Sequence, residues 1–76
     1  MKIYVRAYGT LKGYLRGKKE IELCLEQGST MVTIFRKLRK QKSEIWIVSV
    51  NGKISNEKTV LNDGDVVGIF EPVRGG

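Results

Sequence analysis

The sequence predicts an α+β fold, a mixed sheet of four to five strands with one main helix on one face. Two segments near the N-terminus, 2–8 and 20–26, alternate apolar and polar residues as half-buried strands do. Residues 31–38 space their apolar side chains three and four apart, as an amphipathic helix does. Segments 45–51 and 66–70 follow and are rich in β-branched residues. Because one helix covers only one side of a sheet, we expect the other side to stay exposed.

The chain of 76 residues is expected to form one domain with a single small core, since a chain of this size buries only about 60% of its unfolded surface. We expect the domain to span residues 1–72 and a flexible tail to span 73–76. No apolar run reaches the roughly 20 residues of a membrane span, and the N-terminal stretch is charged and alternating, unlike a signal peptide. A lone Cys24 fits a reducing compartment. The sequence therefore predicts a cytoplasmic protein.

The absence of histidine limits the chemistry that this chain can perform. Histidine is the commonest general base and a common metal ligand, and Cys24 has no second cysteine beside which to bind a metal. We therefore expect no catalytic residues, no bound metal and no enzymatic activity of its own. The net charge of +6, from 14 Lys and Arg against 8 Asp and Glu, is compatible with nucleic acid, with an acidic partner or simply with solubility.

The first two strands are expected to pair as an antiparallel hairpin. Their inward faces consist of Ile3, Val5 and Ala7, and of Ile21, Leu23 and Leu25. Residues 9–19 between them contain three glycines and four cations, which could suggest phosphate binding. No helix N-terminus follows directly, so a solvated loop is predicted instead, with apolar residues packed against the core. Those apolar residues are Leu11, Tyr14 and Leu15.

The helix is expected to begin at Ser29 or Thr30 as N-cap. Its apolar stripe consists of Met31, Ile34, Phe35 and Leu38. The β-branched run 32–34 lowers helix propensity, so tertiary packing must hold the helix in place. Five cations follow, at Arg36, Lys37, Arg39, Lys40 and Lys42. Cations late in a helix complement its dipole, which favours a solvated face over the alternative of a binding patch.

The later strands are predicted at 45–51 and 66–70, with a less regular segment at 54–61 between them. Asn51-Gly52 and Asp63-Gly64-Asp65 are typical of tight turns. Pro72 has no N–H group and should end the last strand. The predicted core is Ile3, Val5, Ile21, Leu23, Leu25, Met31, Ile34, Phe35, Leu38, Val48, Val50, Leu61, Val67 and Ile69.

The exposed side of the sheet and the C-terminus are the candidate functional regions. Tyr4, Ile47 and Phe70 are expected on the exposed side, and with Pro72 they form a candidate partner-docking surface; scattered surface residues are the alternative. Beyond Pro72, Arg74 and Gly75 lead to Gly76, and the glycines put no bulk around the terminal carboxylate. We hypothesise that this carboxylate is the working group of the protein. A tail that is merely frayed is the alternative.

The order of elements with a terminal Gly-Gly resembles the ubiquitin-like β-grasp fold and, more narrowly, the MoaD/ThiS family of sulfur carriers. The residues that carry the resemblance are Val48-Ser49-Val50-Asn51-Gly52, Leu61, Asp63-Gly64-Asp65, Val66 to Phe70, Pro72-Val73 and Gly75-Gly76. Two positions depart from the molybdopterin members. Glu71 stands where they usually have a first proline, and Arg74 is similar to the arginine of ubiquitin's tail. The pathway, whether molybdopterin, thiamine or tRNA thiolation, stays open.

The resemblance implies how the tail would work. An E1-like adenylating enzyme, using ATP and Mg²⁺ that this chain does not itself bind, would adenylate Gly76, and a sulfur donor would then convert it to a thiocarboxylate. The acceptor would be an enzyme such as the molybdopterin synthase large subunit or thiazole synthase. A ubiquitin-like modifier joined to lysines through Gly76 is the first alternative. A small basic nucleic-acid-binding module is a weaker one, because glutamates intersperse the cations; no membrane partner is expected.

Overall fold

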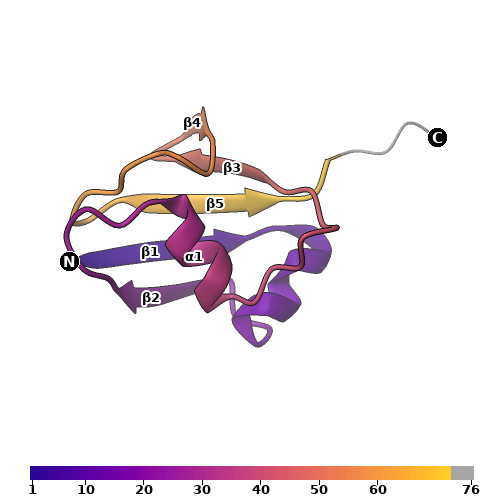
Figure 1. Cartoon of the computed structure of the whole chain (residues 1–76). Coiled ribbons are helices and arrows are strands. Elements are labelled where there is room, and N and C mark those ends of the chain that lie inside the picture. The colour runs from indigo at the N-terminus through magenta and orange to yellow at the C-terminus, as the bar shows by residue number, and fades with distance from the viewer. Residues whose placement is uncertain (73–76) are drawn as a thin grey trace.

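The computed structural model describes residues 1–72 as one mixed five-stranded sheet with a helix across one face (Figure 1). The strands lie in the order β2-β1-β5-β3-β4. Their bounds, with those of the two helices, are β1 Lys2–Ala7, the 3₁₀ helix η1 Gly9–Leu15, β2 Glu20–Cys24, α1 Met31–Lys37, β3 Ile47–Val50, β4 Lys53–Ser55 and β5 Val66–Phe70. This is a ubiquitin-like β-grasp, as predicted. The predicted tail, residues 73–76, lies outside the described residues.

The last strand lies in the middle of the sheet. β5 pairs in parallel with β1, where Val5 is opposite Val67, and antiparallel with β3, where Val48 is opposite Ile69. β1 and β2 form the predicted antiparallel hairpin. β4 pairs with β3 at the far edge. The C-terminal strand is thus held on both sides by the ladder, and its end is fixed relative to the rest of the fold.

The core lies between the sheet and α1. Val67 and Ile69 are completely buried, which confirms the face assigned to the last strand. Leu23 is only half-buried, although the sequence places it in the core, because β2 is an edge strand and has no neighbour on its outer side. Three further residues predicted to be core are also only half-buried: Ile21, Phe35 and Val50.

The prediction of a loop at 9–19 was wrong for the first part of this segment, which forms the 3₁₀ helix η1. Its side chains Leu11 and Leu15 are 1% exposed and close one end of the core. The glycines of this segment suggested a solvated loop, but burial of two leucines decides its conformation. Trp46 is also buried, although it precedes the observed start of β3 and the sequence-based core omits it.

The ends of two other elements differ in detail from expectation. Thr30 occupies the N-cap position of α1, but its hydroxyl makes no capping hydrogen bond. The Ser29 hydroxyl instead donates to the Glu26 carbonyl at 2.7 Å. β3 begins at Ile47 rather than Ile45, and Ile45 is 75% exposed.

The two turn motifs fasten the start of β5. Asp65 is 8% exposed and accepts hydrogen bonds from Asn51 Nδ2 at 2.9 Å and from the Asn62 N–H at 2.8 Å. Asn51 Oδ1 accepts from the Val66 N–H at 2.9 Å. On the other side, the Lys2 N–H donates to Asp63 Oδ1 at 2.7 Å. These motif residues therefore set the register of the last strand.

Within residues 1–72, none of the helices has the length and apolar character needed to cross a membrane.

Replacing Ile34 by alanine should lower the free energy of unfolding by about 2–5 kcal/mol, because the side chain is completely buried and its removal leaves a cavity. Leu23→Ala should lower it by only about 1–2 kcal/mol, because part of that side chain is already in water. Urea unfolding of both variants measures the difference. An equal loss would contradict the assignment of β2 as a thinly covered edge.

Candidate functional site

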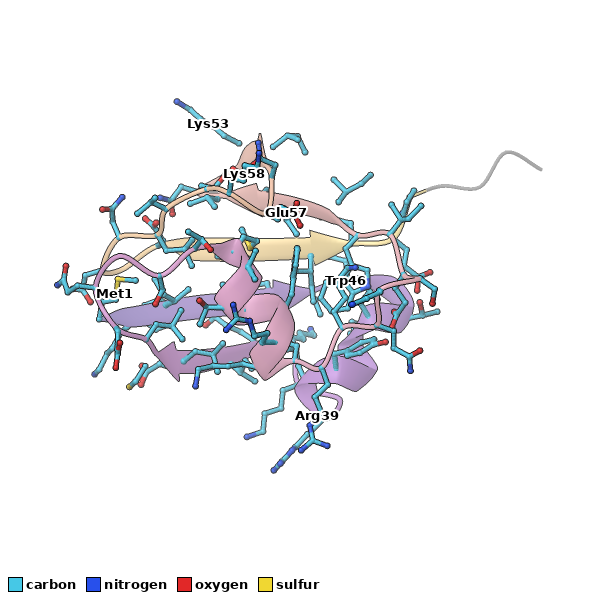
Figure 2. All side chains as sticks on the ribbon, viewed as in Figure 1. Met1, Arg39, Trp46, Lys53, Glu57 and Lys58 are labelled. Carbon is cyan, nitrogen blue, oxygen red and sulfur yellow. The ribbon has the colours of Figure 1, made fainter. Side chains whose placement is uncertain are left out.

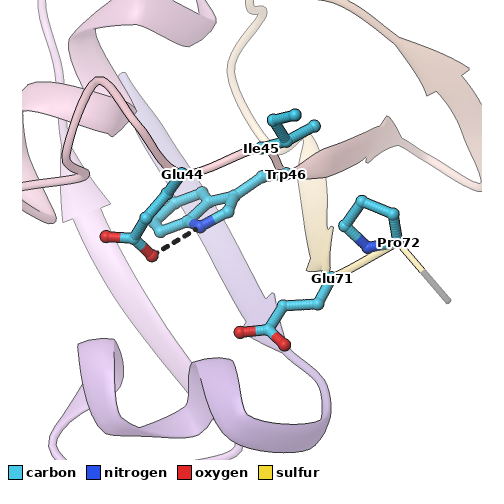
Figure 3. Close-up of a pocket in the computed structure, with 5 residues that line it drawn as sticks. All are labelled: Glu44, Ile45, Trp46, Glu71 and Pro72. Atoms are coloured by element: carbon cyan, nitrogen blue, oxygen red, sulfur yellow. Dashed lines mark hydrogen bonds between the residues drawn. The ribbon is translucent and has the colours of Figure 1, made fainter. Parts of the chain in front are cut away.

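The described chain ends beside a hollow at one end of the sheet. Ile47 at the start of β3 pairs with Phe70 at the end of β5, so Glu71 and Pro72 leave the sheet next to the segment that leads into β3 (Figure 1). A cavity of about 280 Å³ lies here (Figure 3). We call it the tail-root hollow; it is lined by Glu44, Ile45, Trp46, Glu71 and Pro72.

Glu44 organises the wall of the tail-root hollow. It accepts a hydrogen bond from Trp46 Nε1 at 3.2 Å (Figure 3). It also accepts one from the Tyr14 hydroxyl and one from the Gln41 N–H at 3.3 Å. Lys40 Nζ donates to the backbone carbonyl of the same glutamate. One side chain thus joins η1, the segment after α1 and the residue that precedes β3.

The same contacts shift two pKa values in opposite directions. The hydrogen bond from Tyr14 is the main cause that lowers the pKa of Glu44; burial opposes it, and the Trp46 and Gln41 bonds add to it. The hydrogen bond to Glu44 raises the pKa of Tyr14, and burial and the negative charges of Glu44 and Glu71 add to it. The pair is therefore held as a neutral phenol donating to a charged carboxylate.

The aromatic rings around Trp46 hold the indole in place. Tyr14 meets it edge-on with ring centroids 4.9 Å apart, and Phe35 does so at 5.6 Å. Lys40 Nζ lies 5.8 Å from the centre of the Trp46 ring. The hollow therefore has one rigid wall, which favours a fixed shape at the root of the tail.

The face of the sheet opposite α1, the open face, has two apolar ends and a polar middle. Near the tail root, Phe70 stacks on Tyr8 with ring centroids 4.7 Å apart and lies beside Ile47. At the other end, Tyr4 is opposite Val66, four residues before Phe70 on β5 and so about 13 Å away along the strand.

The polar middle of the open face is built around Gly68. Arg6 on β1 and Ser49 on β3 are the residues opposite Gly68, and Arg6 pairs with Glu20 at 3.2 Å. A Cβ atom on Gly68 would lie 2.7 Å from Ser49 Oγ and 3.1 Å from Phe70 Cζ. Only glycine therefore lets the Phe70 ring lie across this part of the strand.

The structure brings together some of the predicted site residues and separates others. Ile47 and Phe70 are neighbours on the open face, whereas Tyr4 lies at its other end and Pro72 lines the tail-root hollow. Arg74, Gly75 and Gly76 lie outside the described residues. Cys24 is exposed on β2.

Three residues of this region were missed as site candidates. Tyr8 had a signal, since the alternation of β1 puts it on the same face as Tyr4. Glu44 and Trp46 had none, because their contacts with Tyr14 span thirty or more residues of sequence.

A β-grasp domain whose central last strand precedes a Gly-Gly sequence is typical of ubiquitin-like proteins. The model of the ThiS family matches residues 6–76, and the chain belongs to this family. Members of the family are small ubiquitin-like sulfur carriers rather than catalysts. None of the curated protein sequences compared with the chain is significantly similar to it.

Solved structures with the same fold include proteins from archaea and bacteria. A Pyrococcus furiosus protein assigned as molybdopterin converting factor, subunit 1, is 29% identical; the match covers 96% of this chain and 99% of that one, with a TM-score of 0.76. Small archaeal modifier protein 1 from Haloferax volcanii is 14% identical over 95% and 98%, with a TM-score of 0.80. A complex of subunits 1 and 2 of molybdopterin-converting factor from Helicobacter pylori contains a chain that is 24% identical over 100% of both, with a TM-score of 0.67. The last two likenesses show the fold alone.

Glu44→Gln should lower the thermal unfolding midpoint at about pH 7, because the amide accepts the Tyr14 bond without the charge. A carboxyl group whose pKa is lowered by folding contributes stability that is present above its ordinary pKa of 4.5 and lost as the pH falls through the lower folded value. The difference in unfolding midpoint between wild type and variant should therefore disappear as the pH falls below the folded pKa of Glu44. Thermal melts across this pH range test it, with Glu57→Gln, an exposed carboxylate, as control. A gap that is independent of pH would contradict the assignment.

Proposed function

We propose that this chain is a ubiquitin-like sulfur carrier whose Gly76 carboxylate is adenylated by an E1-like enzyme and then converted to a thiocarboxylate. The observation that carries the proposal is the family match, which runs through residue 76 and therefore includes the Gly-Gly end. The fold supports it, because β5, the strand that precedes the tail, is central and has Val67 and Ile69 fully buried. The residues that precede the tail are thus fixed in the sheet, and in this proposal the partner binds the tail.

The proposed chemistry explains why a carrier needs an activating partner. A carboxylate is a poor electrophile, because oxide is a poor leaving group. Attack of the Gly76 carboxylate on the α-phosphorus of ATP releases pyrophosphate and forms an acyl-adenylate. A sulfur nucleophile then attacks the carbonyl carbon and AMP leaves, so one carboxylate oxygen departs with AMP and sulfur takes its place. Mg²⁺ and ATP are bound by the partner in this scheme.

We propose that the tail-root end of the open face is the surface on which the partner enzymes dock, the E1-like enzyme among them. Tyr8, Ile47 and Phe70 form an apolar cluster there, and Ile47 is 39% exposed. Pro72 and the tail-root hollow lie next to it, so one partner surface can contact the cluster and receive the tail. The Helicobacter pylori complex of subunits 1 and 2 supports an acceptor of the molybdopterin synthase large-subunit type. A thiazole synthase is the other acceptor that we consider.

A protein modifier is the second candidate function. The likeness to small archaeal modifier protein 1 favours it at the level of the fold, and the Arg74-Gly75-Gly76 sequence is compatible with it. The same adenylate would be attacked by a lysine amine to give an isopeptide bond. Mass spectrometry of the endogenous protein separates the two. Exchange of one oxygen for sulfur supports the carrier, and Gly-Gly remnants on tryptic peptides of other proteins support the modifier.

Removing Gly76, or extending the chain beyond it, should abolish ATP–pyrophosphate exchange with the cognate E1-like enzyme. Deletion shortens the reach of the carboxylate by about 3.5 Å, more than in-line attack tolerates, and extension blocks the carboxylate. Neither change touches the core, so both variants should unfold at the midpoint of the parent. Exchange by either variant at the rate of the intact chain would refute the proposal.

Ile47→Asp should raise the KM for the carrier in the same exchange assay about tenfold and leave kcat unchanged, because it puts a charge into the proposed docking cluster. Val60→Asp is the matched control, since Val60 is 57% exposed and lies outside the docking cluster, where it forms a bridge with Thr30. Equal effects of the two substitutions would argue against docking through the open face.

A further inference from the structure

Two arginines of this chain adopt a backbone conformation that arginine disfavours. Within residues 1–72, the non-glycine residues with positive φ are Arg16 at 56°, Arg39 at 58° and Asn51 at 51°. Asparagine is common in this region of φ/ψ space, but for arginine the Cβ atom crowds the neighbouring carbonyl. A strained conformation that persists suggests that its side chain has a use.

Both arginines end a helix at the position where glycine is usual. After α1, the Arg39 N–H donates to the Arg36 carbonyl at 3.1 Å and the Lys40 N–H to the Phe35 carbonyl at 2.9 Å, which is a Schellman motif. After η1, the Arg16 N–H donates to the Gly13 carbonyl at 3.2 Å. Glycine would satisfy the same backbone bonds without strain.

The two helix ends flank one groove. A cavity of about 490 Å³ lies between the end of η1, the edge strand β2 and the end of α1. We call it the basic groove; its lining comprises Tyr14, Leu15, Arg16, Lys18, Glu20, Ile21, Glu22, Leu23, Lys37 and Leu38. Arg39 directly follows Leu38 and extends away from the body of the molecule on this side (Figure 2). The basic groove shares no lining residue with the tail-root hollow.

The floor of the basic groove is apolar and incompletely covered. Ile21 and Leu23 are half-buried because β2 has no neighbouring strand on its outer side. The free edge of β2 also presents backbone groups that a further extended segment could pair with. An occupant with apolar side chains would remove this surface from water.

The rim of the basic groove is positively charged and largely uncompensated. The lining contains the cations Arg16, Lys18 and Lys37 against the carboxylates Glu20 and Glu22. Among the described residues Arg6–Glu20 is the one ion pair, so Glu20 is already neutralised, whereas Arg16, Lys18 and Lys37 have no carboxylate within salt-bridge distance. Arginine forks bind carboxylates through two parallel hydrogen bonds, which makes them suited to an acidic ligand.

We propose that the basic groove binds an acidic, amphipathic segment of a partner protein, with its apolar side chains on the floor and its carboxylates on the cationic rim. A nucleic acid fits less well. Tyr14 is the one aromatic side chain in the lining of the groove and its hydroxyl is bound to Glu44, so successive bases would find no series of rings on which to stack. This binding is separate from activation of the tail and leaves Glu71 and Pro72 uncovered.

The test compares two double variants that remove the same charge. Arg16→Asn with Arg39→Asn keeps the left-handed backbone, because asparagine tolerates it, and removes Arg16 from the rim together with the neighbouring cation Arg39. Lys53→Asn with Lys58→Asn removes two cations beside β4, on the opposite edge of the sheet (Figure 2). The probe is a fluorescein-labelled peptide of about twelve residues in which glutamate and leucine alternate, so that an extended peptide has all its leucines on one side. Anisotropy gives the affinity, and amide chemical shifts locate the peptide.

Wild type should bind this peptide with shifts at Leu15, Ile21, Leu23 and Leu38. The arginine variant should lose about tenfold in affinity and the lysine variant less than about twofold, with both melting as cooperatively as the parent. Absence of peptide binding, or an equal loss in both variants, would overturn the proposal. Tighter binding of an oligouridylate of similar length than of the peptide would also overturn it and identify a nucleic-acid surface instead.

Discussion

Asp65 and Asn51 form hydrogen bonds with each other and with the backbone at the start of the last strand. The nearly buried Asp65 carboxylate accepts from Asn51 Nδ2 and from the Asn62 N–H, and Asn51 Oδ1 accepts from the Val66 N–H. A buried carboxylate is tolerated only when its lone pairs are satisfied, so this arrangement admits little displacement. The turn after β3 and the turn before β5 are thereby locked together, and β5 enters between β1 and β3 in one register.

The register of β5 determines both faces of the sheet. A shift by one residue would turn Val67 and Ile69 away from the core and bury Phe70 in their place. In the observed register, Phe70 instead reaches the open face, stacks on Tyr8 and lies beside Ile47. Gly68 contributes to the same result, because a side chain there would collide with Ser49 and with the Phe70 ring. The register of β5 therefore determines the geometry of the open face.

Charge is distributed unevenly over this basic chain. The tail-root hollow has two carboxylates, Glu44 and Glu71, whereas the basic groove on the other side of η1 is rimmed by cations. Glu44 is fixed by neutral donors from Tyr14 and Trp46, so its role is to shape the wall of the hollow. Glu71, where the molybdopterin members of the family usually have proline, is exposed. The tail-root hollow and the basic groove therefore have opposite charge and suit ligands of different charge.

Strict alternation in 2–8 and 20–26, the apolar stripe of α1 and the turn motifs before β5 determined the fold class, the hairpin and the core face of the last strand. These signals are local, because the periodicity of a strand or a helix depends only on residues that are close together in the sequence. The resemblance in the tail likewise required only the order of residues. The sequence did not determine that 9–15 form a helix, that β2 is a thinly covered edge, or that Tyr14, Glu44 and Trp46 meet at the tail root. Those features depend on contacts between segments far apart in the chain, and burial of Leu11, Leu15 and Trp46 against a completed sheet decides them.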